Sequence, residues 1–261
     1  MATFETSFVD ACHVGDAELV KDLFDQRVGS RQQQKFPREI SKGLYEAILK
    51  GHKDIVHFLL SNGVKFDGTC FIHGLSKGTV EIVEELMEHG LSVNSLDFKE
   101  PPIRVAVANE NVLKWLLEHG ADPNISNKRG DTALKTAVGN NLLTSVEILL
   151  LHGAKMPPDI LHQGLRSMKL TVPMLRLLVE NGADLNYVHE EYGSPLHHAT
   201  YWGEKKIVQA LLDAGANVNI VEDAALENAL TPAELAKKEN NKEVYDMLVR
   251  ALNDVKASKN T

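Results

Sequence analysis

Six segments of the chain share one pattern of apolar and polar positions, and each segment ends in a glycine. In every segment a leucine lies four positions before the glycine, and a valine or leucine lies seven positions before it. Apolar residues at this spacing line one face of an α-helix, and glycine suits the left-handed conformation that ends many helices. The pattern predicts six amphipathic helices of about three turns each. The glycines are Gly63, Gly90, Gly120, Gly153, Gly182 and Gly215.

A second, shorter helix is predicted ahead of the helices of this type. Its mark is a small residue four positions before a glycine or asparagine turn, as in Ala47–Gly51 and Ala199–Gly203. A small side chain that recurs at one site lets neighbouring helices pack closely. Serine or threonine followed by proline, as at Ser194-Pro195 and Thr231-Pro232, caps the first turn and presets its backbone. The chain therefore reads as a series of helix–turn–helix units.

The stretch from Ser194, "SPLHHATYWGEKKIVQALLDAGANVN", resembles an ankyrin repeat, and "LLEHGADPN" and "LVENGADLN" support the resemblance. The similarity runs from Ser7 to Asp254. It implies an all-α ankyrin-repeat solenoid of about eight helix–turn–helix units with hairpin loops. We expect one domain over residues 1–261: a divergent N-terminal cap unit with a polar insertion (1–39), six central repeats (40–221), a C-terminal cap repeat (222–254) and a disordered tail (255–261).

Three stretches depart from the repeat pattern. The polar run "RVGSRQQQKFPRE" follows the first unit where a hairpin is expected, and "IVEDAALENAL" before Thr231 predicts a longer loop, or finger. In "EPPIRVAVANENV" no glycine marks the turn, so we expect a shortened link between the two helices, made by Asn109 to Asn111. Because a cap begins within about ten residues of Met1, we expect a self-standing protein.

The net charge narrows the classes of partner. A formal charge of −8 disfavours binding to nucleic acid or to an anionic membrane surface. No apolar run approaches the ~18 residues of a membrane span. The two cysteines, Cys12 and Cys70, show no CxxC pairing, which favours a reducing compartment. We expect a cytoplasmic protein that is monomeric alone, with nuclear residence as an open alternative.

The densest set of ligand-type side chains is "HEEYGSPLHH", from His189 to His198. The resemblance implies that His197 braces neighbouring loops by hydrogen bonds. A metal-binding or enzymatic use of this cluster is the less favoured alternative, because histidines that share a metal on a helix are spaced three or four apart. No motif for a nucleophile, a phosphate loop or a zinc protease is present. We expect neither catalysis nor a cofactor.

Histidine recurs in one slot, directly before the turn glycine, at His89, His119 and His152. A residue type that repeats once per unit favours a structural role at the helix end, where an imidazole also suits the helix dipole. Catalysis would require differentiated partners.

Tyr201 and Trp202 fall on the last turn of a short helix, in slots that other repeats fill with small or polar residues. The resemblance implies that these slots face a partner on the concave side, and both residue types are enriched at binding hot spots. The alternative is a purely structural role, in which Trp202 folds onto the next repeat and is covered by the long finger. The remaining residues predicted to contact the partner lie on this and earlier fingers: Glu190, Glu191, Tyr192, Phe98, Lys128 and Arg129.

The function that the resemblance implies is protein binding through the concave face, as a scaffold, adaptor or inhibitor. A second hypothesis is that the chain is the substrate of an asparaginyl hydroxylase. Its target residues would be the hairpin asparagines Asn94, Asn124, Asn186 and Asn219.

Overall fold

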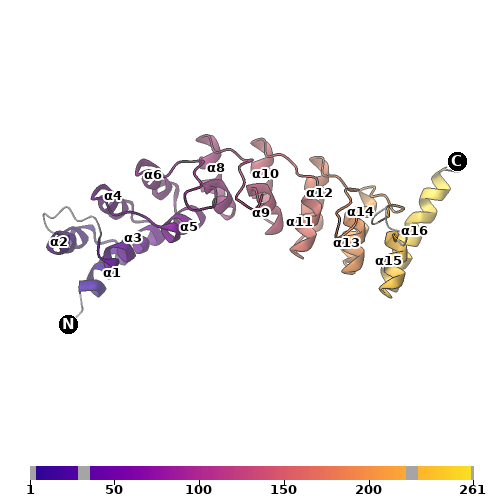
Figure 1. The fold of residues 1–261 in the computed structure, drawn as a ribbon, viewed down its shortest axis with the longest axis horizontal. Helices are drawn as coiled ribbons and strands as arrows, with labels where there is room; N and C mark the ends of the chain where they lie inside the picture. Colours follow the sequence, from indigo (N-terminus) through magenta and orange to yellow (C-terminus); the bar gives the residue numbers. More distant parts are fainter. Residues whose placement is uncertain (1–3, 29–35, 222–228, 260–261) are drawn as a thin grey trace. The chain divides into compact units, whose positions relative to one another are not determined.

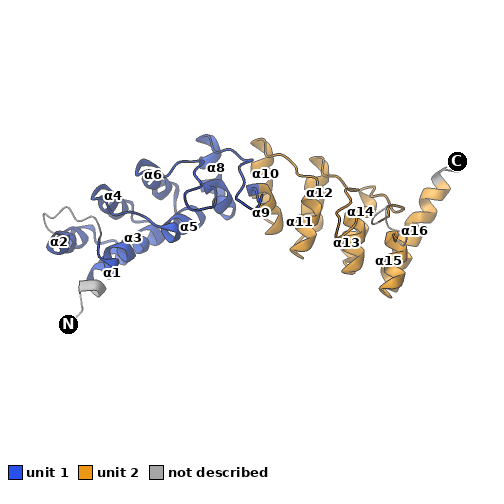
Figure 2. Cartoon of the chain, viewed as in Figure 1, with its two compact units in different colours: residues 1–133 blue, residues 134–261 orange. Residues whose placement is uncertain are grey.

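The computed structural model describes residues 4–28, 36–221 and 229–259. Contacts within the chain divide it into two compact units, residues 1–133 and 134–261 (Figure 2). The described residues are helical and contain no β-strand, so the predicted all-α class is confirmed. Two isolated β-bridges, Ser126–Thr132 and His189–Gly193, close two of the fingers at their bases.

The helices follow one another along the chain as labelled in Figure 1. The first unit holds α1 Phe4–Val14, α2 Ala17–Val28, α3 Arg38–Lys50, α4 Lys53–Ser61, α5 Gly68–Lys77, α6 Val80–Glu88, α7 Pro102–Val105, the 3-10 helix η1 Ala106–Ala108 and α8 Glu110–Glu118. The boundary between the units falls at the first residue of α9, and the helices from there on are α9 Ala133–Gly139, α10 Leu143–Leu151, α11 Ile160–Arg166, α12 Val172–Glu180, α13 Pro195–Tyr201, α14 Lys205–Asp213, α15 Pro232–Lys238 and α16 Lys242–Lys259.

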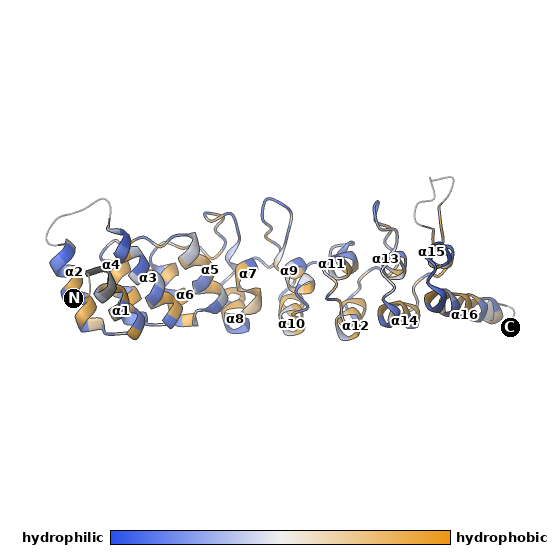
Figure 3. Ribbon diagram, turned by 90° about the horizontal axis from the view of Figure 1, so that it is seen from below, coloured by the Kyte–Doolittle hydropathy of each residue, from blue (hydrophilic) through white to orange (hydrophobic). Residues whose placement is uncertain are grey.

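The described helices form eight pairs, in agreement with the expected number, and each unit has two rows of helices. In the first unit α1, α3, α5 and α7 pack in succession, and α2, α4, α6 and α8 form the second row. In the second unit α11, α13 and α15 make one row, and α10, α12, α14 and α16 make the other. The loops ahead of α9 and α13 project as largely hydrophilic fingers (Figure 3). None of the described helices is both long and apolar enough to cross a membrane.

The six predicted turn glycines all adopt positive φ angles, between 83° and 107°. This left-handed conformation strains any residue with a Cβ, which explains why glycine recurs there. The leucines four positions earlier, such as Leu59, Leu116 and Leu149, are fully buried. The glycine–leucine frame therefore places the helix ends and the core side chains as predicted.

The first helix of each pair is shorter than the second only in part of the chain. In the second unit α9, α11, α13 and α15 have 7 residues each, against 9 in α10, α12 and α14. The prediction is wrong for two pairs of the first unit, because α3 and α5 have 13 and 10 residues and α4 and α6 have 9. No Ser-Pro or Thr-Pro start limits α3 or α5. The side chain of Asp67 instead caps the N-terminus of α5, so the helix begins at Gly68. This side chain accepts hydrogen bonds from the amides of Thr69 and Cys70 at 2.9 Å.

The shortened link in the fourth pair is confirmed. The first helix consists only of α7 and η1, and the single residue Asn109 separates η1 from α8. Asn109 caps α8 by accepting from the Val112 amide, and its own amide group donates to the Gly78 carbonyl at 2.8 Å. Asn111, which was expected in the turn, lies inside α8.

The ends of the predicted domain differ from expectation. The expected disordered tail at residues 255–261 is wrong for its first part, because α16 continues to Lys259. The helix continues because no glycine or asparagine turn interrupts this last segment. Most of the polar insertion (29–35) and of the long finger (222–228) lies outside the described residues. The boundaries of a single domain over residues 1–261 stay a prediction.

Leu149 offers a test of the repeat frame. It is fully buried on α10, which packs against α12. We expect Leu149→Ala to lower the free energy of unfolding by roughly 2–5 kcal/mol, because it leaves a cavity in the core. Leu151, two residues on and 83% exposed, is the control, and Leu151→Ala should change stability by less than about 0.5 kcal/mol. Urea unfolding measures both, and equal midpoints would contradict this register.

Asn109 offers a test of the shortened link. Asn109→Ala removes the α8 cap and leaves the Gly78 carbonyl without its side-chain donor. The expected loss in free energy of unfolding is about 1–3 kcal/mol. Exposed Asn111 on the same helix is the matched control. Thermal melts that shift equally for Asn109→Ala and Asn111→Ala would show that the link does not depend on this side chain.

Candidate functional site

Tyr201 and Trp202 stand exposed at the end of α13, with 55% and 54% of their surfaces accessible. Ser194 and Pro195 start this helix, and it ends at Tyr201, two residues before Gly203, which has a φ of 70°. The two rings meet edge to face with centroids 5.3 Å apart. The described residues leave Trp202 half open. Most of the finger that the alternative places over Trp202 (222–228) lies outside the described residues, so that alternative stays a prediction.

The finger before α13 brings further predicted residues to the same place. A depression of about 500 Å³ opens beside Tyr201 and Trp202. Glu191 lines it beside the half-buried Tyr192. A hydrogen bond to the Glu191 carboxylate raises the pKa of the Tyr192 hydroxyl, so the two side chains act as one polar edge. Glu190 is exposed on this finger but does not line the depression. The full lining is Glu191, Tyr192, His197, His198, Tyr201, Trp202 and Leu235.

His197 braces the loops, as the resemblance implied. Its Nδ1 accepts from the Ser194 amide at 3.2 Å, which assigns the ring proton to Nε2. The Nε2–H then donates to the Leu230 carbonyl, 2.9 Å away in the next finger. Burial lowers the pKa of His197, and the bond to Leu230 opposes this shift. A neutral imidazole thus ties one helical pair to the next.

A second bracing histidine escaped the sequence analysis. His162 on α11 donates from Nε2 to the Gly193 carbonyl at 2.9 Å, 31 residues further along the chain. It lies 35 residues before His197, near the repeat length, and each follows a leucine, so alignment of the two helices was the available signal. "ILHQGL" lacks the Ser-Pro start that drew attention to His197.

Rings stack behind the depression. His198 stacks on Tyr192 with centroids 4.6 Å apart, and His162 lies 5.7 Å from His198. Burial is the main reason that the pKa of both histidines falls to about 4. Neighbouring groups lower these pKa values further: His189 acts on His162, and His162 and Arg166 act on His198. Among the described residues, the Nδ1 atoms of both buried rings have no hydrogen-bond partner. The two buried rings are therefore uncharged near neutral pH.

The alternative metal site between His189 and His198 gains no geometric support. Both nitrogens of His197 are engaged, and His189 Nδ1 accepts from the Glu191 amide at 3.1 Å. Among the described residues, three ligand-type side chains converge within 4.8 Å of one another only at His57, Glu85 and Glu88. The cluster at His189–His198 serves packing and bracing.

The other predicted contact residues belong to the first compact unit. Phe98 is half-buried and stacks on Phe71 with centroids 4.8 Å apart, so it stabilises its own finger. Lys128 and Arg129 are exposed at a finger tip. The side chain of Asn127 shapes that tip by accepting from the amides of Arg129 and Asp131. Within the second unit the structure brings Glu191, Tyr192, Tyr201 and Trp202 together. A shared surface with the three residues of the first unit stays a prediction.

The histidines before the turn glycines have the predicted helix-end role. Each donates from Nδ1 to the carbonyl four residues earlier, at 2.7–2.9 Å. Asn62 and Asn181, in the same slot, donate from their amide groups to the equivalent carbonyls at 2.8 Å. The slot therefore selects a hydrogen-bond donor that satisfies the last turn. The histidines are His89, His119 and His152.

The buried rings predict a pH-dependent stability. A histidine whose pKa falls from its ordinary 6.5 to about 4 on folding binds fewer protons in the folded chain. The stabilisation is complete above pH 6.5 and is lost as the pH falls toward 4. The slope reaches about 1.4 kcal/mol per pH unit for each group. Urea unfolding between pH 7 and 5 should show a flatter profile for His198→Leu than for the parent, while the exposed-histidine control His119→Gln keeps the parent slope. Parallel profiles for all three proteins would contradict this assignment.

Comparison with known proteins gives the family. A model of ankyrin repeats in three copies matches residues 71–159 and 161–260. The Caenorhabditis elegans "Ankyrin repeat and KH domain-containing protein mask-1" is 25% identical over 91% of this chain, and the Neurospora crassa "Ankyrin repeat protein nuc-2" is 28% identical over 84%. This chain spans only 11% and 22% of the length of these two relatives.

A solved structure agrees with the observed arrangement. The human ASB11 ankyrin repeat domain matches with a TM-score of 0.65 and 25% sequence identity, covering 80% of this chain and 98% of that domain. The family model covers well over half of the chain, and the helical pairs, turn glycines and bracing histidines described above fit it. The chain belongs to the ankyrin-repeat family.

Proposed function

We propose that this protein binds a partner protein at the depression beside Tyr201 and Trp202. Ankyrin repeats are generally protein-interaction modules. The observation that carries the proposal is the exposure of two large aromatic side chains at the rim of a depression of about 500 Å³. Aromatic side chains that line a pocket are the usual anchors of binding energy. The role is that of a scaffold, adaptor or inhibitor that acts by occupancy.

The chemistry of the rim favours a partner segment that carries arginine or lysine among apolar residues. The faces of Tyr201 and Trp202 attract a cation, and Trp is the strongest such ring. Glu191 supplies a carboxylate at the edge, and exposed Glu190 adds a second acidic side chain on the same finger. Leu235 of α15 also lines the depression and offers an apolar contact to the neighbouring side chains of such a segment.

Asparaginyl hydroxylation is the alternative role, and it stays a prediction. Asn94 donates to the Gly120 carbonyl and accepts from the Asp122 amide at 2.9 Å, so its side chain is used to join two hairpins. Asn186 accepts from the Asn217 amide in the same way, at 2.8 Å. A hydroxylase would have to open these contacts, which weighs toward the binding role.

The double variant Tyr201→Ala with Trp202→Ala tests the proposed site. Because both side chains are more than half exposed, the melting temperature should stay within a few degrees of the parent. Loss of a hot spot costs about 2 kcal/mol or more, so partner affinity should fall by about thirtyfold or more. Quantitative mass spectrometry of captured proteins identifies the partner, and a titration then measures its affinity.

Leu151→Ala is the matched control, since it removes another exposed apolar side chain in the same unit. A true partner is retained by the parent and by Leu151→Ala and is lost from the double variant. If every specific partner remains bound to the double variant with unchanged affinity, the site is elsewhere.

A further inference from the structure

Glu85 is a buried carboxylate in a position built for apolar side chains. It is 4% exposed on α6, five residues before a turn glycine. Four of the five equivalent positions in other repeats hold large apolar residues. A buried carboxylate is costly unless a cation or hydrogen-bond donors compensate it. The equivalent residues are Phe58, Trp115, Ile148, Leu177 and Ala210.

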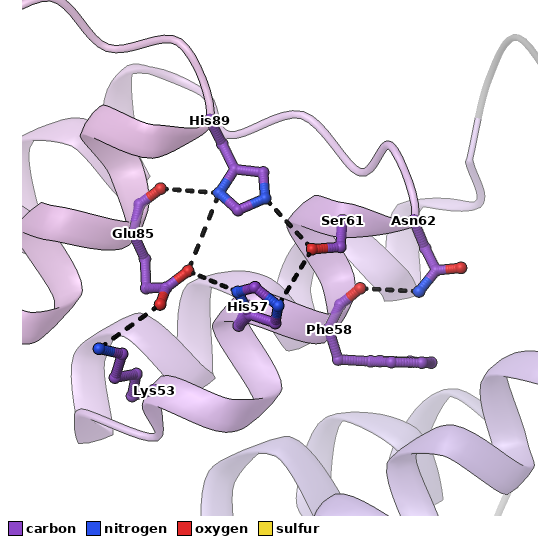
Figure 4. A network of polar contacts seen from close by, with 7 residues as sticks. All are labelled: Lys53, His57, Phe58, Ser61, Asn62, Glu85 and His89. Atoms are coloured by element: carbon purple, nitrogen blue, oxygen red, sulfur yellow. Dashed lines mark hydrogen bonds and ion pairs between the residues drawn. The ribbon is translucent and has the colours of Figure 1, made fainter.

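Positive and imidazole groups converge on this carboxylate from two neighbouring helices (Figure 4). His57 on α4 donates from Nδ1 to Glu85 Oε2 at 2.9 Å. The Lys53 ammonium lies 3.7 Å from Oε1, and His89 Nδ1 lies 3.9 Å from Oε2. The Ser61 hydroxyl sits between the Nε2 atoms of His57 and His89, at 3.4 and 3.3 Å. All five side chains belong to the first compact unit.

We propose that His57, Glu85 and Glu88 form a binding site for a divalent transition metal of the zinc class, which joins α4 to α6. Each residue offers a ligand atom, and these atoms lie within 4.8 Å of one another. Ligands about 2.1 Å from a tetrahedral zinc are about 3.4 Å apart, so modest rotations of the exposed His57 and Glu88 close the site. Water completes the fourth position.

The donor set selects the metal. One imidazole nitrogen with two carboxylates suits Zn²⁺ and its neighbours in the first transition row. Mg²⁺ and Ca²⁺ prefer shells made entirely of oxygen. The buried Glu85 is held in place by its helix and by its contacts, so the site has one preorganised ligand around which the other two gather.

The surroundings of His57 fit a metal ligand. When Nδ1 binds the metal, its proton moves to Nε2, and the imidazole stays neutral. Ser61 Oγ already lies 3.4 Å from Nε2 and accepts that proton in a hydrogen bond. A metal-bound histidine ordinarily donates its other N–H in this way, which fixes the ring. The Lys53 ammonium, with its side chain 47% exposed, moves from the carboxylate into solvent.

The fourth repeat supplies a built-in comparison. Glu118 and His119 occupy the slots of Glu88 and His89, but Trp115 replaces the buried carboxylate. His119 stacks on Trp115 with ring centroids 3.9 Å apart and donates to the Trp115 carbonyl. Glutamate and histidine thus recur at this helix end without the buried carboxylate, and Glu84 stands in the preceding repeat at the slot of His57.

The test is a titration of the full chain, purified without an affinity tag, with Zn²⁺ in competition with a chromophoric chelator. We expect one zinc per chain at micromolar affinity or tighter. His57→Gln, Glu88→Gln and Glu85→Leu should each weaken binding by about tenfold or more. Leucine is the residue at the Leu177 slot, so Glu85→Leu should fold, and the other two variants carry the test if it does not. Glu118→Gln with His119→Gln is the control and should bind zinc like the parent.

Lys53 provides a variant that moves the result in the opposite direction. Lys53→Gln removes the cation that competes for Glu85, so it should tighten zinc binding several-fold. Parent affinity in His57→Gln and Glu85→Leu would overturn the proposal and show an adventitious ion only. Weaker binding in Lys53→Gln, or displacement of zinc by equimolar Mg²⁺, would overturn it as well.

Discussion

The apolar stripe of each second helix is the constraint on which the rest of the molecule depends. A pair such as α9 and α10, of seven and nine residues, cannot bury the leucines of its second helix by itself. The neighbouring pairs in the row cover this stripe. Leu59 and Leu86, four residues before successive turn glycines, are fully buried, and their helices α4 and α6 pack against each other and against further neighbours in the row. Stability therefore comes from nearest-neighbour contacts along each unit, and a lost contact weakens first the pairs beside it.

Polar contacts between fingers add a second, directional link to this packing. His162 and His197 each donate from a neutral ring to a carbonyl more than 30 residues ahead, and Asn94 and Asn186 join successive hairpins. Such bonds fix the distance between adjacent fingers, because the buried donors would otherwise lack partners. Fingers held this way present their side chains at set positions, which is what a recognition surface requires.

The side chains of both proposed sites lie at positions where this chain departs from the repeat pattern. Ala199 and Thr200 in the last turn of α13 are fully buried, whereas Tyr201 and Trp202 at its end are more than half exposed. The Glu85 slot is the opposite case: packing expects an apolar residue, and a buried carboxylate instead collects His57 and Lys53 around it. Both features depart from the repeat pattern, and departures from a repeat are where individual function can be encoded.

The sequence by itself determined the helical pairs, the left-handed turns and the caps, because these follow from local backbone chemistry. Gly63 and Gly215 adopt positive φ angles directly after helix ends, and Ser194 with Pro195 starts α13. It also indicated the exposed aromatic pair, since its slots lack an apolar requirement. Only the tertiary structure decided the extra length of α3, the bracing by His162 and the cluster around Glu85. The bracing and the cluster depend on side chains and backbone groups contributed by neighbouring repeats, and one repeat read alone carries no signal of what its neighbour offers.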